Sequence, residues 1–387
     1  MPALLAFCCL PIGGAFSTYF YKGGLFVFDA YFIAFTIAAY ARVMITNTRL
    51  PASPVLWVIC IVVAYGIVGI FAGPADKYFF RDIRLVLFLL YLYTFLTIGY
   101  WLWVPSRNQA ISLFFISSIS CIVLSAANAG GLIEYSDNYY EANSFRYIAV
   151  PTYIAASFVI LSRFVERIFA RRLVYFTLLS LCFLAISLSG SRVLVFGSAA
   201  IFLLTRAARP INLAWASVAL TLVGVGLVQG STSQIYERLF NLEPVRVMHE
   251  LQNRFLPFID VLAEFQGPNY ITGLGFGTKF EIPWFAYREM KDIRNNYIDS
   301  AYLTLYAKLG FMGLAYLGVT VNALTKVAGL TTRAELLSVW AFFVVYLGVY
   351  CMPYQIVAVG FVVGFFLFHC VREGYGQNTT RRLPVTT

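Results

Sequence analysis

The sequence predicts an all-α, polytopic integral membrane protein with about 12 transmembrane helices and one long extracytoplasmic loop that contains amphipathic helices. Of its 387 residues, 60% are hydrophobic and only 12% are charged, and the mean hydropathy is +0.77. Soluble domains carry about a quarter charged residues, so that class is excluded. Apolar runs recur along the chain, and one polar stretch, residues 231–298, interrupts them. These observations predict the membrane fold.

Each apolar run is about long enough to cross hydrocarbon, which takes about 20 helical residues. The runs lie at 4–20, 24–44, 54–73, 83–104, 110–130, 147–166, 172–189, 193–206, 211–229, 299–325, 334–352 and 355–371. The first is expected to be retained as a span or signal anchor. The two short runs that flank residues 187–192 could be two spans or one broken, re-entrant pair.

The expected organisation has three parts. Residues 1–230 hold transmembrane helices 1–9, residues 231–298 form the long loop, and residues 299–387 hold helices 10–12 and a cytoplasmic tail. The even-numbered connections and the tail carry 14 Lys and Arg residues, whereas the short odd-numbered connections carry 6. By the positive-inside rule, both termini are cytoplasmic and the long loop, ninth in order, faces outward.

The formal net charge of +10 indicates contact with anionic lipid. Nucleic acid is excluded as a partner, because the basic residues are scattered singly. The seven cysteines lie in or beside apolar runs, which argues against disulfides and thiolate metal sites. His249 and His369 are far apart, and the acidic loop residues have no metal-ligand spacing. The sequence therefore predicts neither a metal nor another cofactor.

The long loop contains one segment with helical periodicity, residues 246–265. Its apolar positions recur at helical spacing and are Val247, Leu251, Phe255, Phe258, Leu262 and Phe265. Glu250, Asn253, Asp260 and Glu264 fall elsewhere on the helical wheel. This pattern predicts an amphipathic helix that lies on the membrane, with a kink at Pro257.

Three motifs follow one another across the second half of the chain. Ser-Gly-Ser-Arg stands at 189–192, Gly-x-Gly-x-Gly at 273–277, and Asp-x-x-Tyr-Leu-x-Leu-x-x-x-x-Gly-x-x-Gly at 299–313. The glycine segment is not a dinucleotide fingerprint, since no strand precedes it. It is expected to let the backbone approach another segment closely. In order and spacing, the set resembles the Wzy-type O-antigen and polysaccharide polymerases and the related O-antigen ligases.

The resemblance implies a glycosyltransferase of the bacterial inner membrane that acts on undecaprenyl-diphosphate-linked sugars, with the long loop in the periplasm. Its expected partners are a lipid-linked glycan donor and acceptor, the lipid bilayer and a chain-length regulator protein. Ligases usually carry a His-Asn or similar pair just before the Tyr-Leu, where this chain has Asp299-Ser300. This departure favours polymerisation of oligosaccharide repeat units over ligation of the glycan to lipid A core or protein.

Transfer from a lipid diphosphate needs cations that stabilise the leaving group and a base that positions the incoming hydroxyl. Arginine suits the first task, because its guanidinium makes bidentate contacts to phosphate oxygens. Arg192, Arg254 and Asp299 are the candidate catalytic residues, with Asp299 as the base. The candidate substrate-binding residues are Arg81, Arg84, Arg146, Arg288, Arg294, Tyr302 and Lys308.

Each candidate also has a structural interpretation. Arg192 could be an interfacial arginine whose charged end extends to the head groups, and Arg254 could contact head groups. Arg81 and Arg84 could anchor a helix at the interface, and Tyr302 could belong to an aromatic belt.

Two further structural roles concern Asp299 and the charged residues within apolar runs. Asp299 could cap the helix that follows it. Asp29 and Lys308 lie inside apolar runs, where ionisable groups usually serve function. Lys308 could instead pair with another polar group of the protein.

A transporter of lipid-linked oligosaccharide is the alternative from another functional class. Internal repeats and broken helices around a midplane site would be expected for it. No such repeat is visible in the sequence, and the long outer loop favours an enzyme.

Overall fold

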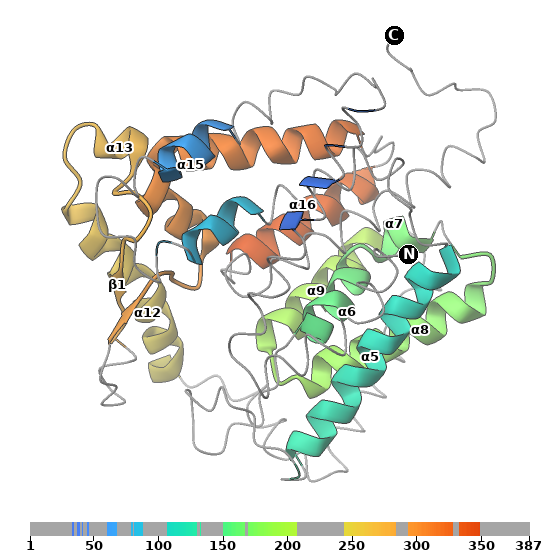
Figure 1. Ribbon diagram of the computed structural model, residues 1–387. Helices are drawn as coiled ribbons and strands as arrows, with labels where there is room; N and C mark the ends of the chain where they lie inside the picture. The colour runs from blue at the N-terminus through green and yellow to red at the C-terminus, as the bar shows by residue number, and fades with distance from the viewer. Residues whose placement is uncertain are drawn as a thin grey trace.

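The computed structural model describes residues 33–34, 37–38, 41, 45, 60–67, 79, 81–87, 107–129, 132, 150–166, 169–206, 244–283, 293–327 and 333–348. These residues are mostly helical, as the sequence predicts (Figure 1). The helices are α5 (Arg107–Ala129), α6 (Val150–Ile160), α7 (Ser162–Val165), α8 (Arg172–Leu188), α9 (Arg192–Arg206), α12 (Pro244–Ala263), α13 (Asn269–Thr272), α15 (Ala301–Val327) and α16 (Arg333–Gly348). Residues 60–67 and 81–87 are also helical.

Helices α5, α6, α8 and α9 form one packed group, and α16 packs against α9 (Figure 1). Small polar side chains lie where these helices meet. The Cys121 thiol is 3.3 Å from the Thr152 hydroxyl and donates to the carbonyl oxygen of Ala185, while the Ser118 hydroxyl is 3.2 Å from the Cys182 thiol. Small residues let helix backbones approach closely, and their hydrogen bonds join the helices.

The two short apolar runs at 172–189 and 193–206 form two separate helices. α8 ends at Leu188, and α9 begins at Arg192 after a three-residue turn. The amide of Ser189 donates to the carbonyl oxygens of Ala185 and Ile186, and Gly190 has a φ of 67°. Glycine adopts this left-handed conformation without the steric cost that a side chain would bring.

A second group of elements surrounds the start of α15. It contains α12, α13 and a two-stranded antiparallel ladder of β1 (Phe280–Glu281) and β2 (Arg294–Asn295). The buried core of this group joins side chains from α12, from β1 and from the segments beside them to α15, and its members are Val261, Phe265, Phe280, Ile282, Ile298 and Ala307. Residues 244–283 and 293–298 of the polar loop therefore form a folded structure built on the end of α15.

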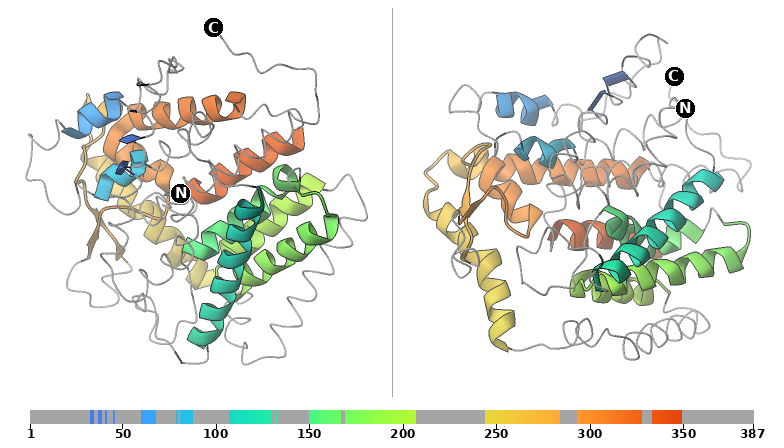
Figure 2. Two further views of the ribbon diagram at one scale, coloured as in Figure 1. Left: turned by 45° about the vertical axis from the view of Figure 1, so that its right-hand side comes forward. Right: turned by 60° about the horizontal axis from the view of Figure 1, so that its bottom comes forward.

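Two views in the figures show how α12 is placed. In Figure 1 and in the right panel of Figure 2, α12 runs across the end of α15 and not along it. Its inner residues Phe258 and Leu262 pack against the core of the loop. The predicted helix over 246–265 is thus confirmed, and it continues through Pro257.

Within the part of the chain that the structure describes, one helix segment, Ala301–Val319, is long and apolar enough to cross a membrane. Five shorter apolar helix segments of 10–17 residues accompany it: Ile111–Ala127, Pro151–Ile160, Arg172–Leu188, Val193–Leu203 and Glu335–Val344. They fall within the predicted runs. The arrangement of about 12 spans remains a prediction.

Candidate functional site

Asp299 lies at the entrance to α15, one residue before the position that caps the helix. α15 begins at Ala301, and the amide of Leu303 is directed at the hydroxyl of Ser300 at 3.5 Å. The Thr304 hydroxyl donates to the Ser300 carbonyl oxygen at 2.7 Å. Ser300 therefore occupies the capping position that the sequence analysis offered to Asp299. The carboxylate of Asp299 is left 54% exposed.

Arg254 of α12 reaches this carboxylate. Its Nε lies 3.8 Å from Oδ2 of Asp299, and the arginine side chain is 25% exposed. The contact follows from packing, because Val261 of α12 and Phe265, just beyond the end of α12, are buried together with Ile298, which immediately precedes Asp299. Two of the three predicted catalytic residues, 45 positions apart in the sequence, thus form one partly exposed ion pair.

The third predicted catalytic residue, Arg192, is the first residue of α9. α9 packs against α6 and α16, whereas Arg254 and Asp299 belong to the group around α12 and α15. The expected meeting of Arg192 with the ion pair therefore stays a prediction.

The predicted substrate-binding residues lie in several places. Arg81 is half-buried and Arg84 is buried in the helical segment 81–87. Arg294 pairs across the β-ladder with Glu281, with 3.3 Å between Nε and Oε1 and both side chains exposed. Tyr302 is partly buried, with its ring beside Gly348 of α16. Arg146 and Arg288 lie outside the described residues.

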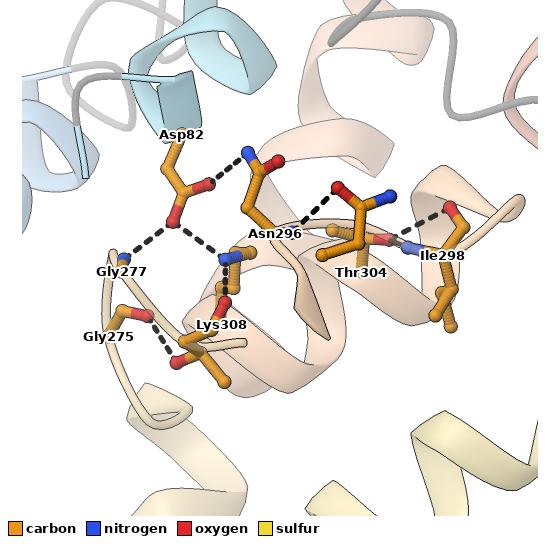
Figure 3. Close-up of polar contacts among 9 residues, drawn as sticks. Asp82, Gly275, Gly277, Asn296, Ile298, Thr304 and Lys308 are labelled. Carbon is orange, nitrogen blue, oxygen red and sulfur yellow. Dashed lines mark hydrogen bonds and ion pairs between the residues drawn. The ribbon is translucent and has the colours of Figure 1, made fainter. Parts of the chain in front are cut away.

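Lys308 has its partners inside the protein. Its Nζ donates to Oδ2 of Asp82 at 2.7 Å and to the carbonyl oxygen of Thr278 at 2.6 Å, and the side chains of Lys308 and Asp82 are both 0% exposed (Figure 3). This is the structural pairing that the sequence analysis left open. A buried charge is tolerated only when it is paired and hydrogen-bonded, and both conditions are met here.

Asp82 is the centre of this buried network (Figure 3). Besides Lys308, it accepts a hydrogen bond from the amide of Gly277 at 2.6 Å and one from Nδ2 of Asn296 at 3.3 Å. These donors come from the glycine segment, from the end of the polar loop and from α15. Asp82 therefore joins the helical segment 81–87 to three separate parts of the candidate site.

The glycine segment 273–277 fits into a break in α15. Gly310, with φ 57° and ψ −147°, interrupts the helix. The carbonyl oxygens of Ala307 and Lys308 instead accept hydrogen bonds from the amides of Leu274 at 3.0 Å and Gly275 at 2.9 Å. The loop thus satisfies backbone groups that the break leaves without helical partners, which is necessary in a buried setting.

Close approach explains why glycine stands at both sides of this contact. A Cβ atom at Gly273 would overlap the backbone of Lys308 and Leu309, and one at Gly310 would overlap the carbonyl group of Ile271. Phe276 anchors the loop from its other side, because its ring packs edge-on against Phe79 with centroids 5.8 Å apart. The prediction that the glycine segment allows a close backbone approach is confirmed.

Aromatic side chains line the junction between the polar loop and α15. The ring of Tyr306 stacks on Phe265 with centroids 5.8 Å apart and meets Phe258 at 6.1 Å. Phe311 packs edge-on against the other side of Tyr306 at 5.3 Å. These rings fix α12 on α15 and with it the distance between Arg254 and Asp299.

Sequence reasoning missed Asp82 and Asn296. Asp82 lies between Arg81 and Arg84, just outside the apolar run 83–104, and nothing in its local sequence distinguishes it from a residue of a polar connection. A signal did exist, because a lysine within an apolar run needs a counter-ion. The identity of the partner could not be deduced, since 226 positions separate the two residues.

The arrangement offers two chemical functions side by side. An exposed carboxylate can accept a proton from a hydroxyl group, and a guanidinium can bind a phosphate oxygen. Among the described residues, no group of three or more His, Cys, Asp or Glu side chains could hold a metal ion.

The sequence matches the model of one protein family. A model described as "Family of unknown function (DUF6369)" matches residues 104–374, which include every labelled helix from α5 to α16. No curated protein matches the chain. No solved structure matches it.

Proposed function

The chain belongs to DUF6369, a family of unknown function, and we propose that it polymerises undecaprenyl-diphosphate-linked oligosaccharide repeat units at the outer face of the bacterial inner membrane. The observation that carries the proposal is the Arg254–Asp299 ion pair, which unites a phosphate-binding group and a base at 3.8 Å. The ordered motifs at 189–192, 273–277 and 299–313 support it by their resemblance to Wzy-type polymerases.

The proposed membrane placement follows from hydropathy and charge. About 12 helices cross the bilayer, both termini are cytoplasmic, and the long loop folds in the periplasm. In this arrangement Asp299 stands where the loop meets a span, at the level of lipid head groups. A lipid diphosphate presents its phosphates at the same level, while its polyprenyl chain remains in hydrocarbon.

In the proposed reaction, one glycosidic bond forms and one glycosyl–phosphate bond breaks. The carboxylate of Asp299 accepts the proton of the acceptor hydroxyl, whose oxygen attacks C1 of the donor glycan. The bond between C1 and the diphosphate oxygen breaks, and the undecaprenyl diphosphate leaves with the bonding electrons. Arg254 binds the anionic charge of this leaving group, with Arg192 as the second cation. The proton passes from Asp299 to solvent.

In this proposal Asp82 and Lys308 have a positioning role, because they hold the elements of the site in place. The network around Asp82 fixes the glycine segment, Asn296 and α15 relative to one another (Figure 3). Asn296 is three residues from Asp299, so the same network fixes the entrance of α15. In this proposal Lys308 does not contact substrate, because its ammonium group is fully buried.

The test is elongation by the full-length protein in proteoliposomes, with lipid-linked repeat units extracted from cells that lack it. The unsubstituted chain is expected to give a ladder of longer lipid-linked glycans. Asp299→Asn should lower the rate about 10²-fold or more through loss of the base. Arg254→Gln should lower it about 10²-fold to 10³-fold through loss of leaving-group stabilisation.

Controls separate chemistry from folding. Asp260→Asn removes an exposed carboxylate from the same helix as Arg254 and should leave the ladder unchanged. The double exchange Arg254→Asp with Asp299→Arg restores an ion pair but reverses both chemical roles, so it should stay inactive. A full ladder from Asp299→Asn, or its recovery in the double exchange, would contradict the proposal.

Two other outcomes identify the alternatives. Transfer of one preformed glycan to lipid A core or protein, without a ladder, indicates a ligase. Movement of lipid-linked units across the bilayer without a change in their length indicates a transporter.

A further inference from the structure

α12 has three distinct sides. A helix turns about 100° per residue, so residues three, four and seven positions apart share a side. The first side faces the protein: Val261 and Phe265 are buried in the core of the loop, and Phe258 and Leu262 pack against it. Arg254 belongs to this side, where it meets Asp299.

The second side is apolar but remains exposed. Its members, with their exposed fractions, are Val245 (67%), Met248 (58%), Leu251 (44%), Phe255 (49%), Leu256 (41%) and Ile259 (54%). Gln252 is the polar residue among them, and it is exposed as well. Contiguous apolar patches of this kind are uncommon on protein surfaces that face water, and they mark contacts with other proteins or with membranes.

The third side is polar. Asp260 and Glu264 lie next to the apolar side on the wheel, away from the core, and both are exposed. Helical periodicity predicted a single membrane-facing apolar stripe that contains Phe258, Leu262 and Phe265 as well as Leu251 and Phe255. The structure divides that stripe along its length, because the first three lie in or against the core, whereas Leu251 and Phe255, nearer the start of α12, remain exposed.

Exposed apolar side chains also occur on α13 and α15, to which the loop is attached. On α13, Tyr270 is 45% exposed and Ile271 is 59% exposed. Ile271 adjoins the break in α15, since a Cβ atom at Gly310 would overlap its carbonyl group. The next residue of α15, Phe311, is 58% exposed. Exposed apolar side chains thus also lie at the one described helix segment that is long enough to span a membrane.

We infer that this side of α12, together with Ile271 and Phe311, rests on the lipids of the outer leaflet. This inference depends on the membrane placement proposed above. A helix that lies in the interface needs an apolar side toward the acyl chains and a polar side toward water. α12 has both, and its first side, which faces the protein, attaches it to α15, whose end it crosses (Figures 1 and 2).

This placement fixes the depth of the candidate site. Arg254 lies on the protein side of α12, next to Phe255 on the lipid side. A guanidinium in that position stands at the head-group layer, where the diphosphate of a lipid carrier is found. The lipid contact of α12 thus brings the Arg254–Asp299 pair to the level of its substrate.

The test is lipid photolabelling of the full-length protein in nanodiscs that contain a diazirine phospholipid. Adducts mapped by mass spectrometry should be severalfold more frequent on Met248, Leu251, Phe255 and Ile259 than on Asp260, Glu264 or residues 279–281. No substrate is present, so the result does not depend on whether the chain is a polymerase.

Two outcomes would overturn the inference. One is labelling of the apolar side no stronger than that of residues 279–281. The other is cross-links between α12 of two copies in place of lipid adducts, which would assign the surface to a second copy. Phe255→Ser combined with Ile259→Ser should lower lipid adducts on α12 while adducts on α15 persist, because both side chains lie outside the core.

Discussion

Lys308→Met is expected to destabilise the protein by about 3–5 kcal/mol, because it removes the buried ammonium group that pairs with the carboxylate of Asp82. Asp82→Asn should lower the free energy of unfolding by a similar amount, since it removes the carboxylate that pairs with the buried ammonium group of Lys308. The double variant should cost clearly less than either single one. It buries no charge, and the amide oxygen introduced by Asp82→Asn can still accept the Gly277 amide. The free energies of unfolding in detergent micelles measure these differences.

The exposed pair Arg294–Glu281 provides a matched control. Its side chains are 58% and 60% exposed, so Arg294→Gln should change stability by about 1 kcal/mol or less. If the Asp82–Lys308 double variant were as unstable as Lys308→Met alone, buried charge would not be the source of the effect. The cost would then come from the lost hydrogen bonds to Thr278 or Asn296.

Gly273→Ala is expected to destabilise the protein by about 3–5 kcal/mol and to abolish elongation. Gly273 has a φ of 69°, and its new methyl group would overlap the backbone of Lys308 and Leu309, which no side-chain movement can relieve. Gly310→Ala should act in the same way through the backbone of Ile271. Thermal unfolding midpoints by fluorescence-detected size-exclusion chromatography report both variants.

Substitutions at two other glycines distinguish the effect of steric overlap at Cβ from the effect of backbone strain at a positive φ. Gly275 also has a positive φ, 92°, but nothing lies within 4 Å of its Cβ position. Gly275→Ala should therefore cost only about 1–2 kcal/mol. Gly318→Ala, in α15 with nothing within 4 Å, should be stabilising by up to about 1 kcal/mol. Equal losses at Gly273 and Gly275 would show that the contact with α15 is unimportant.

Hydropathy and periodicity were sufficient to predict the helices. The apolar runs at 110–130, 172–189 and 299–325 coincide with α5, α8 and α15 within a few residues. Both signals are local, since the apolar pattern of one helix is read from residues within a few turns of each other. The break at Gly310 could not be predicted, because it depends on a loop more than thirty residues away whose amides replace the lost helical bonds.

The proximity of two candidate residues could be predicted from chemistry, whereas their catalytic roles remain predictions. Arg254 and Asp299 were selected as partners for one substrate, and the structure places them together. The function of Lys308 was left open between substrate and structure, and burial with Asp82 decides for structure in the described state. The position of Arg192 relative to the pair depends on how two helix groups meet, which no local pattern encodes.

The ion pair between Asp82 and Lys308 also constrains the biogenesis of the chain. Their 226 positions of separation correspond to roughly 10–45 s of translation at about 5–20 residues per second. Throughout that interval the nascent chain contains Asp82, while Lys308, its partner in the ion pair, has not yet been synthesised. Fragments that terminate upstream of Lys308 lack this partner. Cellular quality control is therefore expected to degrade such truncated chains, even when most of their helices have been inserted.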